Sequence, residues 1–402
     1  MLCATALIAV GCSATDTEPS ASIAAPLPTA APAVAPDVLN ARGEIVESVA
    51  LTGFFDDPDG VIGEARRAVY RSTSGLDGGA REVSGVFFVP PGASPPGGWR
   101  VMSIGHGTTG IASDCGPSQD GDLLGFWPMV RSYLREGYAV AMTDYEGLGH
   151  PGRHPYLEPR SAAFNVIDAV RALRLLYPGV SDRWVAFGNS QGGQAVWAAN
   201  ELAAQYGDGL NLVGAVALSP GANVTALADL AGSQSLSSEQ RDLLPLVVDG
   251  VGRYNPTLVE NSVLPALTPE QEAEAFSCAP GAETRREALI PPSSIHLDDE
   301  RSVALLRAAL RRIALPQRTL SAPMLVVNGL ADRTIPPSWV SAAVDEACRL
   351  GGRIEHVEVT DAGHGDLGAA AYETASTWVS DRFAGLPAPS NCGGPARVLP
   401  GG

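Results

Sequence analysis

The chain has 402 residues and a formal charge of −17 at pH 7, because 44 Asp and Glu residues face 27 basic residues, all of which are Arg. A chain this acidic lacks the basic face that nucleic acid or an anionic membrane surface requires, so we expect neither as a partner. The absence of Lys also excludes Schiff-base chemistry, a P-loop Lys and a Ser-Lys dyad. The length allows one large domain or two ordinary ones.

The N-terminal apolar run is too short to cross a bilayer as a helix. Residues 1–12 end in Ala9-Val10-Gly11-Cys12, a pattern typical of a bacterial lipoprotein signal, which predicts lipidation of Cys12. Residues 13–40 are rich in Pro, Ala and Ser and predict a disordered tether. We therefore expect a secreted or cell-surface lipoprotein that meets the membrane only through its lipid; a wrongly placed start of a cytosolic chain is the alternative.

Four further cysteines follow the tether, and an even number in an exported chain indicates two disulfides. They have no C-x-x-C spacing of a zinc site, and three connectivities are open. Four buried thiols are the alternative interpretation. The residues are Cys115, Cys278, Cys348 and Cys392.

From residue 41 onward, short apolar runs alternate with segments of helical period. This order predicts a mostly parallel central sheet with helices on both faces, the α/β class. The expected strands are 82–89, 100–104, 138–143, 184–187, 212–218, 324–327 and 354–359. The expected helices are 162–176, 191–205, 338–350 and 368–383, and residues 385–402 are expected to be irregular.

The alternation stops between about 224 and 320, where no strand is expected. Helix starts with an N-cap residue and early acids are seen at 237–240, 268–271 and 298–301. This segment predicts a helical cap inserted into a domain that spans 41–402. Its apolar run Leu243, Leu244, Leu246, Val247 and Val248 would be cap core or the wall of an apolar pocket.

The sharpest motif is Gly188-Asn189-Ser190-Gln191-Gly192-Gly193, between a predicted strand and a predicted helix. This is the context of a nucleophile elbow, in which glycines let the two limbs of a strained turn approach each other. We expect Ser190 to be a nucleophile. The amide of Gln191, at the start of the helix, would then stabilise negative charge on a substrate oxygen.

An activated Ser needs a His base and a carboxylate that orients it, and both follow the nucleophile in this fold. His364 and Asp332 each come just after a predicted strand, so we expect both at the same edge of the sheet as Ser190. The competing residues are less suited to these roles. His296 lies in the helical insertion, His356 in a strand, and Asp361 and Asp366 too close in sequence to His364.

The loop Gly105-His106-Gly107-Thr108-Thr109-Gly110 follows another strand of this sheet. Its glycines allow backbone amides to turn toward a substrate oxygen, so we expect an oxyanion hole from the amides of Gln191 and Thr108, with Thr109 as the alternative. His106 is expected to support the loop.

A third loop, 143–156, contains acids and two histidines. His150 and His154 have i, i+4 spacing, but the prolines beside them prevent the helix that would align them on a metal. We therefore expect no metal and no other cofactor.

With these motifs in order, the chain resembles the secretory lipase family, the lipase A-like branch of the α/β-hydrolases, over about residues 45–393. The resemblance implies hydrolysis of triacylglycerols or other carboxylic esters, a helical cap before the acid-bearing strand, and Ser190, Asp332 and His364 as the catalytic residues. It also implies disulfides Cys115–Cys278 and Cys348–Cys392.

Residues and resemblance together lead to the hypothesis of a secreted serine ester hydrolase that works through an acyl-enzyme, with an ester or lipid as its substrate. A serine peptidase or an acyltransferase could use the same triad. A catalytically silent surface binding protein is the alternative from another class.

Overall fold

The core of the computed structural model, which describes residues 32–255, 257–258, 263–295, 297 and 299–401, is a sheet of ten strands in the order β1-β2-β3-β5-β4-β6-β7-β8-β9-β10. Strands β1, β2, β3 and β5 pair antiparallel, and β5, β4 and β6 to β10 pair parallel. The predicted α/β class is confirmed. The strands are β1 Ile45–Ala50, β2 Glu64–Thr73, β3 Ala80–Val89, β4 Trp99–Gly105, β5 Ala139–Thr143, β6 Val180–Asn189, β7 Asn211–Leu218, β8 Met324–Gly329, β9 Ile354–Val359 and β10 Arg397–Leu399.

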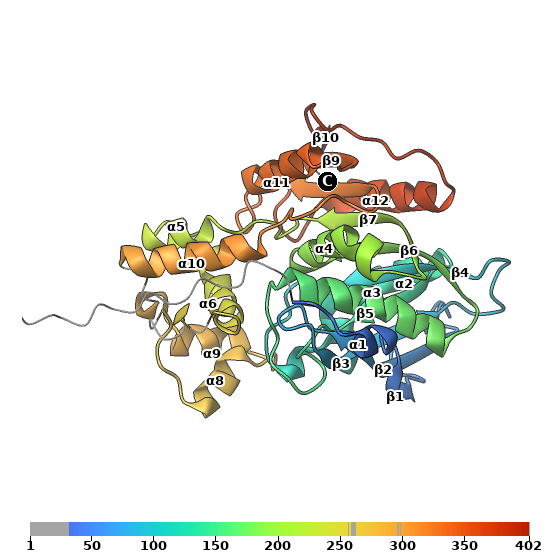
Figure 1. Ribbon diagram of the computed structural model, residues 1–402, viewed down its shortest axis with the longest axis horizontal. Helices are drawn as coiled ribbons and strands as arrows, with labels where there is room; N and C mark the ends of the chain where they lie inside the picture. Colours follow the sequence, from blue (N-terminus) through green and yellow to red (C-terminus); the bar gives the residue numbers. More distant parts are fainter. Residues whose placement is uncertain (1–31, 256, 259–262, 296, 298, 402) are drawn as a thin grey trace, which may run out of the picture. The chain divides into compact units, whose positions relative to one another are not determined.

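Helices cover both faces of the sheet (Figure 1). Buried side chains of α3, α4 and α11 join one hydrophobic cluster with the sheet, and those of α2 and α12 join a second. Two separate clusters are the expected result of a sheet that is apolar on both sides. The helices are α2 Trp127–Arg135, α3 Pro159–Leu176, α4 Gln191–Tyr206, α11 Pro337–Arg349 and α12 Gly368–Phe383.

Strand β7 shows how side-chain size sets the distance between the sheet and its helices. Ala215 and Ala217 belong to the cluster of α3 and α4, while Val216 and Leu218 belong to the cluster of α12, as the alternation of a strand requires. Alanine has a small side chain, so α4 can pack close to the sheet. The N-terminus of α4 is therefore held next to the ends of the central strands.

Between β7 and β8 the described residues form helices and no strand, in agreement with the composition of this segment. Two of these helices begin with a capping box, from Ser237 and Gln240 in α6 and from Thr268 and Gln271 in α8. Asp299 caps α10. The helices, yellow-green to orange in Figure 1, are α5 Leu227–Gly232, α6 Ser238–Gly252, α8 Pro269–Phe276, α9 Ala282–Leu289 and α10 Glu300–Ile313.

The structure differs from the sequence prediction at both ends of the domain. Helix α1, Pro36–Asn40, lies inside the segment expected to be a disordered tether, so ordered structure begins a few residues earlier. Residues 397–399 form β10, which pairs with β9, although 385–402 were expected to be irregular. The predicted signal and Cys12 lie outside the described residues. No described helix has the length and apolar composition that a membrane crossing needs.

The chain returns from the insertion to the sheet past a buried carboxyl group on α4. Glu201 accepts hydrogen bonds from the indole N–H of Trp197 at 3.1 Å and from the backbone N–H of Gln317 at 3.1 Å. Burial raises the pKa of Glu201 to about 7. The protonation of Glu201, and with it the hydrogen bonds to Trp197 and Gln317, therefore depends on pH.

We predict that Glu201→Gln removes a loss of stability that the native protein undergoes between about pH 4.5 and pH 7. A carboxyl with a raised pKa keeps its proton in the folded state while the unfolded chain is already ionised, so folding stability falls as the pH rises from the ordinary pKa of 4.5 to about 7 and then stays low. The amide cannot ionise and escapes this loss. The melting temperature of the variant relative to the native protein should therefore be higher at pH 8 than at pH 5.

The exposed Glu373 provides the control, since its replacement by Gln should leave the difference in melting temperature the same at both pH values. An equally constant difference for Glu201→Gln would contradict the prediction.

Candidate active site

Ser190 lies on the turn between β6 and α4 with a positive φ of 57° and a ψ of −116°. A non-glycine residue held there is strained, and the surroundings must maintain it. The backbone N–H of Ser190 donates to Leu218 O at 2.9 Å, and the N–H of Gly221 donates to Ser190 O at 3.1 Å. A Cβ on Gly188 would collide with the carbonyl of Gly192. The geometry is that of a nucleophile elbow.

The structure brings Ser190, His364 and Asp332 into one hydrogen-bonded chain. His364 Nε2 lies 2.8 Å from Ser190 Oγ, and its Nδ1 lies 2.7 Å from Asp332 Oδ2. A carboxylate only accepts, so the imidazole proton is on Nδ1 and Nε2 is free to accept from the serine hydroxyl. Asp332 is buried, and its Oδ1 accepts the backbone N–H groups of Thr334 and Ile335, each at 2.8 Å. These bonds fix the carboxylate and direct Oδ2 to the imidazole.

The competing residues have other partners. His356 is buried on β9, where its Nε2 lies 2.7 Å from Asn328 Oδ1. Asp366 accepts the N–H of Gly368 at 3.1 Å, and Asp361 is exposed. His296 lies outside the described residues.

The loop after β4 lies directly beside the nucleophile. A Cβ built on Gly107 would be 3.9 Å from Ser190 Cβ. Within the described part of the chain, the backbone N–H groups of Thr108 and Gln191 donate to no acceptor. A helix begins with such free donors, and here they lie on two segments that meet at Ser190. Two amides are thus available to a ligand oxygen.

The remaining histidines lie around these loops. His106 is buried, with Nδ1 2.6 Å from Gly107 O and Nε2 3.2 Å from Asp144 O, which fits a supporting role. His150 lies 3.8 Å from Glu82 Oε2. Among the described residues, no group of three or more His, Cys, Asp or Glu could hold a metal ion.

Two side-chain contacts beside Ser190 could not be predicted from the local sequence. The side-chain nitrogen Nε2 of Gln191 lies 2.7 Å from Nε2 of His154, and Thr108 Oγ1 lies 2.6 Å from the hydroxyl of Tyr156. The partners are 37 and 48 residues apart, so neither motif spacing nor helical period relates them. They show that the loop after β5 reaches both segments that present free amides.

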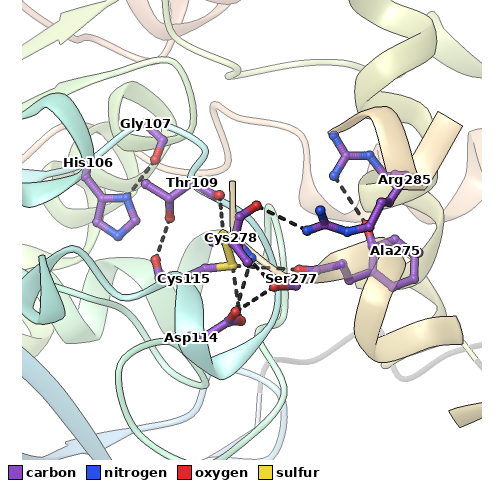
Figure 2. The surroundings of a disulfide bond; sticks show 12 residues. His106, Gly107, Thr109, Asp114, Cys115, Ala275, Ser277, Cys278 and Arg285 are labelled. Atoms are coloured by element: carbon purple, nitrogen blue, oxygen red, sulfur yellow. Dashed lines mark hydrogen bonds between the residues drawn. A yellow bond between two sulfur atoms is a disulfide. The ribbon is translucent and has the colours of Figure 1, made fainter. Parts of the chain in front are cut away.

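A disulfide joins Cys115, near the loop after β4, to Cys278, just beyond α8 (Figure 2). Asp114 strengthens this junction, because its Oδ2 accepts the Ser277 hydroxyl at 2.7 Å and the Cys278 N–H at 3.2 Å. The second disulfide joins Cys348 to Cys392. These are the two pairs that the family resemblance implies.

Helix α6 connects the cap to the loop that carries Asp332. The hydroxyl of Ser237 donates to Arg333 O at 3.0 Å, and Gln240 Nε2 donates to Thr334 O at 3.1 Å. The apolar run of α6 is mostly cap core, since Leu244, Leu246, Val247 and Val248 are at most 3% exposed.

Solved structures with the same arrangement are α/β-hydrolases. Lipase A from Candida antarctica in its closed state superposes with a TM-score of 0.67 at 17% identity, over 89% of this chain and 86% of that one. The rice cell wall degrading esterase LipA from Xanthomonas oryzae gives 0.64 at 20% identity, over 85% and 98%. At these identities the likeness shows the fold, and the fold is that of the α/β-hydrolases.

Sequence comparison finds a likeness to one family of lipases. The model of the secretory lipase family matches residues 127–274, which confirms the resemblance to that family. Lipase 6 from Candida albicans is 25% identical over 287 residues, 64% of this chain. The secreted triacylglycerol lipase LIP4 from Malassezia globosa is 26% identical over 275 residues, 65% of this chain.

The chain matches 58% of the length of each of these curated relatives. Both relatives are fungal, so they do not support the expectation of a bacterial lipoprotein.

We predict that Gly188→Ala destabilises the protein by at least about 2 kcal/mol, because the new methyl group meets main-chain atoms that cannot move without opening the elbow. Chemical denaturation measures the change. The matched control is Gly221→Ala, where the added Cβ would lie 3.8 Å from Ser190 O, in ordinary contact. Equal stability of the two variants would contradict this account of the elbow.

Proposed function

We propose that this protein is a serine carboxylic-ester hydrolase of the lipase or esterase type that works through an acyl-enzyme. The observation that carries the proposal is the hydrogen-bonded chain from Ser190 through His364 to Asp332, next to the free amides of Gln191 and Thr108. This is the set of parts that acyl transfer by a serine requires.

In the first half of the reaction, Ser190 Oγ attacks the ester carbonyl carbon while its proton passes to His364 Nε2. The carbonyl oxygen becomes an oxyanion, which the amides of Gln191 and Thr108 stabilise. Asp332 holds the imidazole in the required tautomer and stabilises the imidazolium that forms. The C–O bond to the alcohol then breaks, and His364 delivers the proton to the leaving alkoxide.

In the second half, a water molecule takes the place of the alcohol. His364 accepts a proton from this water, whose oxygen attacks the acyl carbon and again forms an oxyanion. The bond to Ser190 Oγ breaks, the serine recovers its proton, and a carboxylic acid leaves. These steps need no metal or organic cofactor.

The substrate is an acyl ester. The curated relatives are named a lipase and a secreted triacylglycerol lipase, and a fold neighbour is named a cell wall degrading esterase, which leaves the acyl chain length to experiment. Export is part of the proposal, because two disulfides fit an oxidising compartment. Lipidation of Cys12 remains a prediction from the sequence.

We predict that Ser190→Ala lowers the hydrolysis of p-nitrophenyl esters by at least about 10³-fold, because the acyl-enzyme cannot form. Asp332→Asn should also lower the rate strongly, since the amide favours the wrong tautomer of His364. The matched control is Asp361→Asn, which changes the competing carboxylate and should retain the native rate. The assay uses acyl chains from acetate to palmitate.

The same experiment separates the alternatives. Equal rates for the native protein and Ser190→Ala would contradict the mechanism. Activity on peptide amides alone would indicate a peptidase, and preferential transfer of the acyl group to added alcohol would indicate an acyltransferase. If Asp361→Asn loses activity while Asp332→Asn keeps it, Asp361 would be the carboxylate that orients His364.

A further inference from the structure

The loop from residue 144 to residue 157, which follows β5 and is called here the β5 loop, contacts both halves of the oxyanion hole of the proposed mechanism. His154 bonds to the side chain of Gln191, and Tyr156 bonds to the side chain of Thr108. Both contacting residues are buried, at 2% exposure each. One short segment thus holds two segments that are far apart in sequence.

The direction of the first bond follows from the tautomer of His154. Its Nδ1 lies 2.8 Å from the carbonyl oxygen of Glu146, which can only accept, so the ring proton is on Nδ1. In a neutral imidazole Nε2 is then an acceptor, and it takes a hydrogen from the amide nitrogen of Gln191. Burial lowers the pKa of His154 to about 3, which keeps the ring neutral at ordinary pH.

Among the described residues, His154 is the one hydrogen-bond partner of the Gln191 side chain, so this bond sets the orientation of the amide. Gln191 is 2% exposed, and its Oε1 has no hydrogen-bond partner in the described part of the chain. A reversed amide would place the NH₂ group away from His154 and turn an oxygen toward the lone pair of Nε2. His154 therefore holds the residue that directly follows Ser190, at the first turn of α4.

The second bond, between Tyr156 and Thr108, also involves a buried side chain, that of Tyr156. Burial raises the pKa of Tyr156 to about 12, so its hydroxyl stays protonated beside Thr108. The rings of the loop pack together: Tyr145 stacks on His154 with centroids 5.8 Å apart, and Tyr156 meets His154 edge to face at 6.1 Å. Tyr145 also donates to His106 O at 3.1 Å. This packing makes the loop a stiff support.

We propose that His154 and Tyr156 are positioning residues that hold the two oxyanion donors, Gln191 and Thr108, at a fixed separation. The inference rests on the proposed function. Neither residue touches the reacting atoms; each acts through its partner. A small displacement of a donor weakens the stabilisation of the transition state more than it weakens the binding of the ester. The reason is that the oxyanion forms only during the reaction.

We predict that His154→Leu and Tyr156→Phe each lower kcat about 10-fold to 100-fold while KM changes little, since a misplacement of about 1 Å can cost 10²-fold. Inactivation by an alkyl p-nitrophenyl phosphonate diester should slow by a similar factor, because Ser190 displaces p-nitrophenolate and the strongly polarised phosphoryl oxygen then occupies the same hole. His154→Gln keeps an acceptor near the position of Nε2 and should restore most of kcat. His150→Gln, on the same loop, should match the native protein.

Double-mutant cycles show whether each residue acts through its partner. In a Gln191→Met background His154→Leu should add little further loss, and in a Thr108→Val background Tyr156→Phe should add little. Native kcat in both single variants, or full additivity in both cycles, would overturn the inference. Melting temperatures check folding, and if His154→Leu does not fold, Tyr156→Phe with its cycle and the rate of His154→Gln decide.

Failure of the inference is distinct from failure of the proposed function. If Ser190→Ala is inactive while His154→Leu and Tyr156→Phe are fully active, the β5 loop has no positioning role and the mechanism stands. If Ser190→Ala is active, the mechanism itself is wrong.

Discussion

The structure depends on the close approach of three backbone segments at the ends of β4 and β6. A Cβ on Gly192 would collide with the carbonyl of Gly105, and one on Gly188 with the carbonyl of Gly192. Only glycine at these positions lets α4 start directly behind β6 while Ser190 occupies a strained conformation that costs about 1–3 kcal/mol. Every other part of the site is placed relative to this turn. The loops that carry Asp332 and His364 reach it from the ends of β8 and β9.

The sequence predicted the central strands of the sheet and missed the strands at its edges, for a physical reason; it also missed α2. Strands in the middle of the sheet are buried on both faces, so they read as continuous apolar runs. β1 is largely exposed and β2 contains Arg66, Arg67 and Arg71, so neither shows such a run. β10 has only three residues and is defined by its pairing with β9. The short helix α1 was likewise hidden by the Pro- and Ala-rich composition around it.

The proposed catalytic residues could be predicted because each one follows a buried strand, and parallel strands bring their ends to one edge. The contacts that support the proposed oxyanion hole could not be predicted. Gln191 and His154 meet only because α4 and the β5 loop pack together, and nothing in either segment indicates its partner. The sequence even favoured comparing His154 with His150, whereas His150 lies near Glu82. Contacts between side chains on separate loops require the assembled fold.

Gly250 on α6 gives the cap a part in this arrangement. A Cβ there would lie 2.6 Å from Tyr156 Cβ, so the helix backbone rests on the residue that bonds to Thr108. Helix α6 of the cap and the side chain of Thr108 therefore contact the same residue, Tyr156. If α6 takes more than one position, any effect of that position on Thr108 through Tyr156 acts equally in the reverse direction.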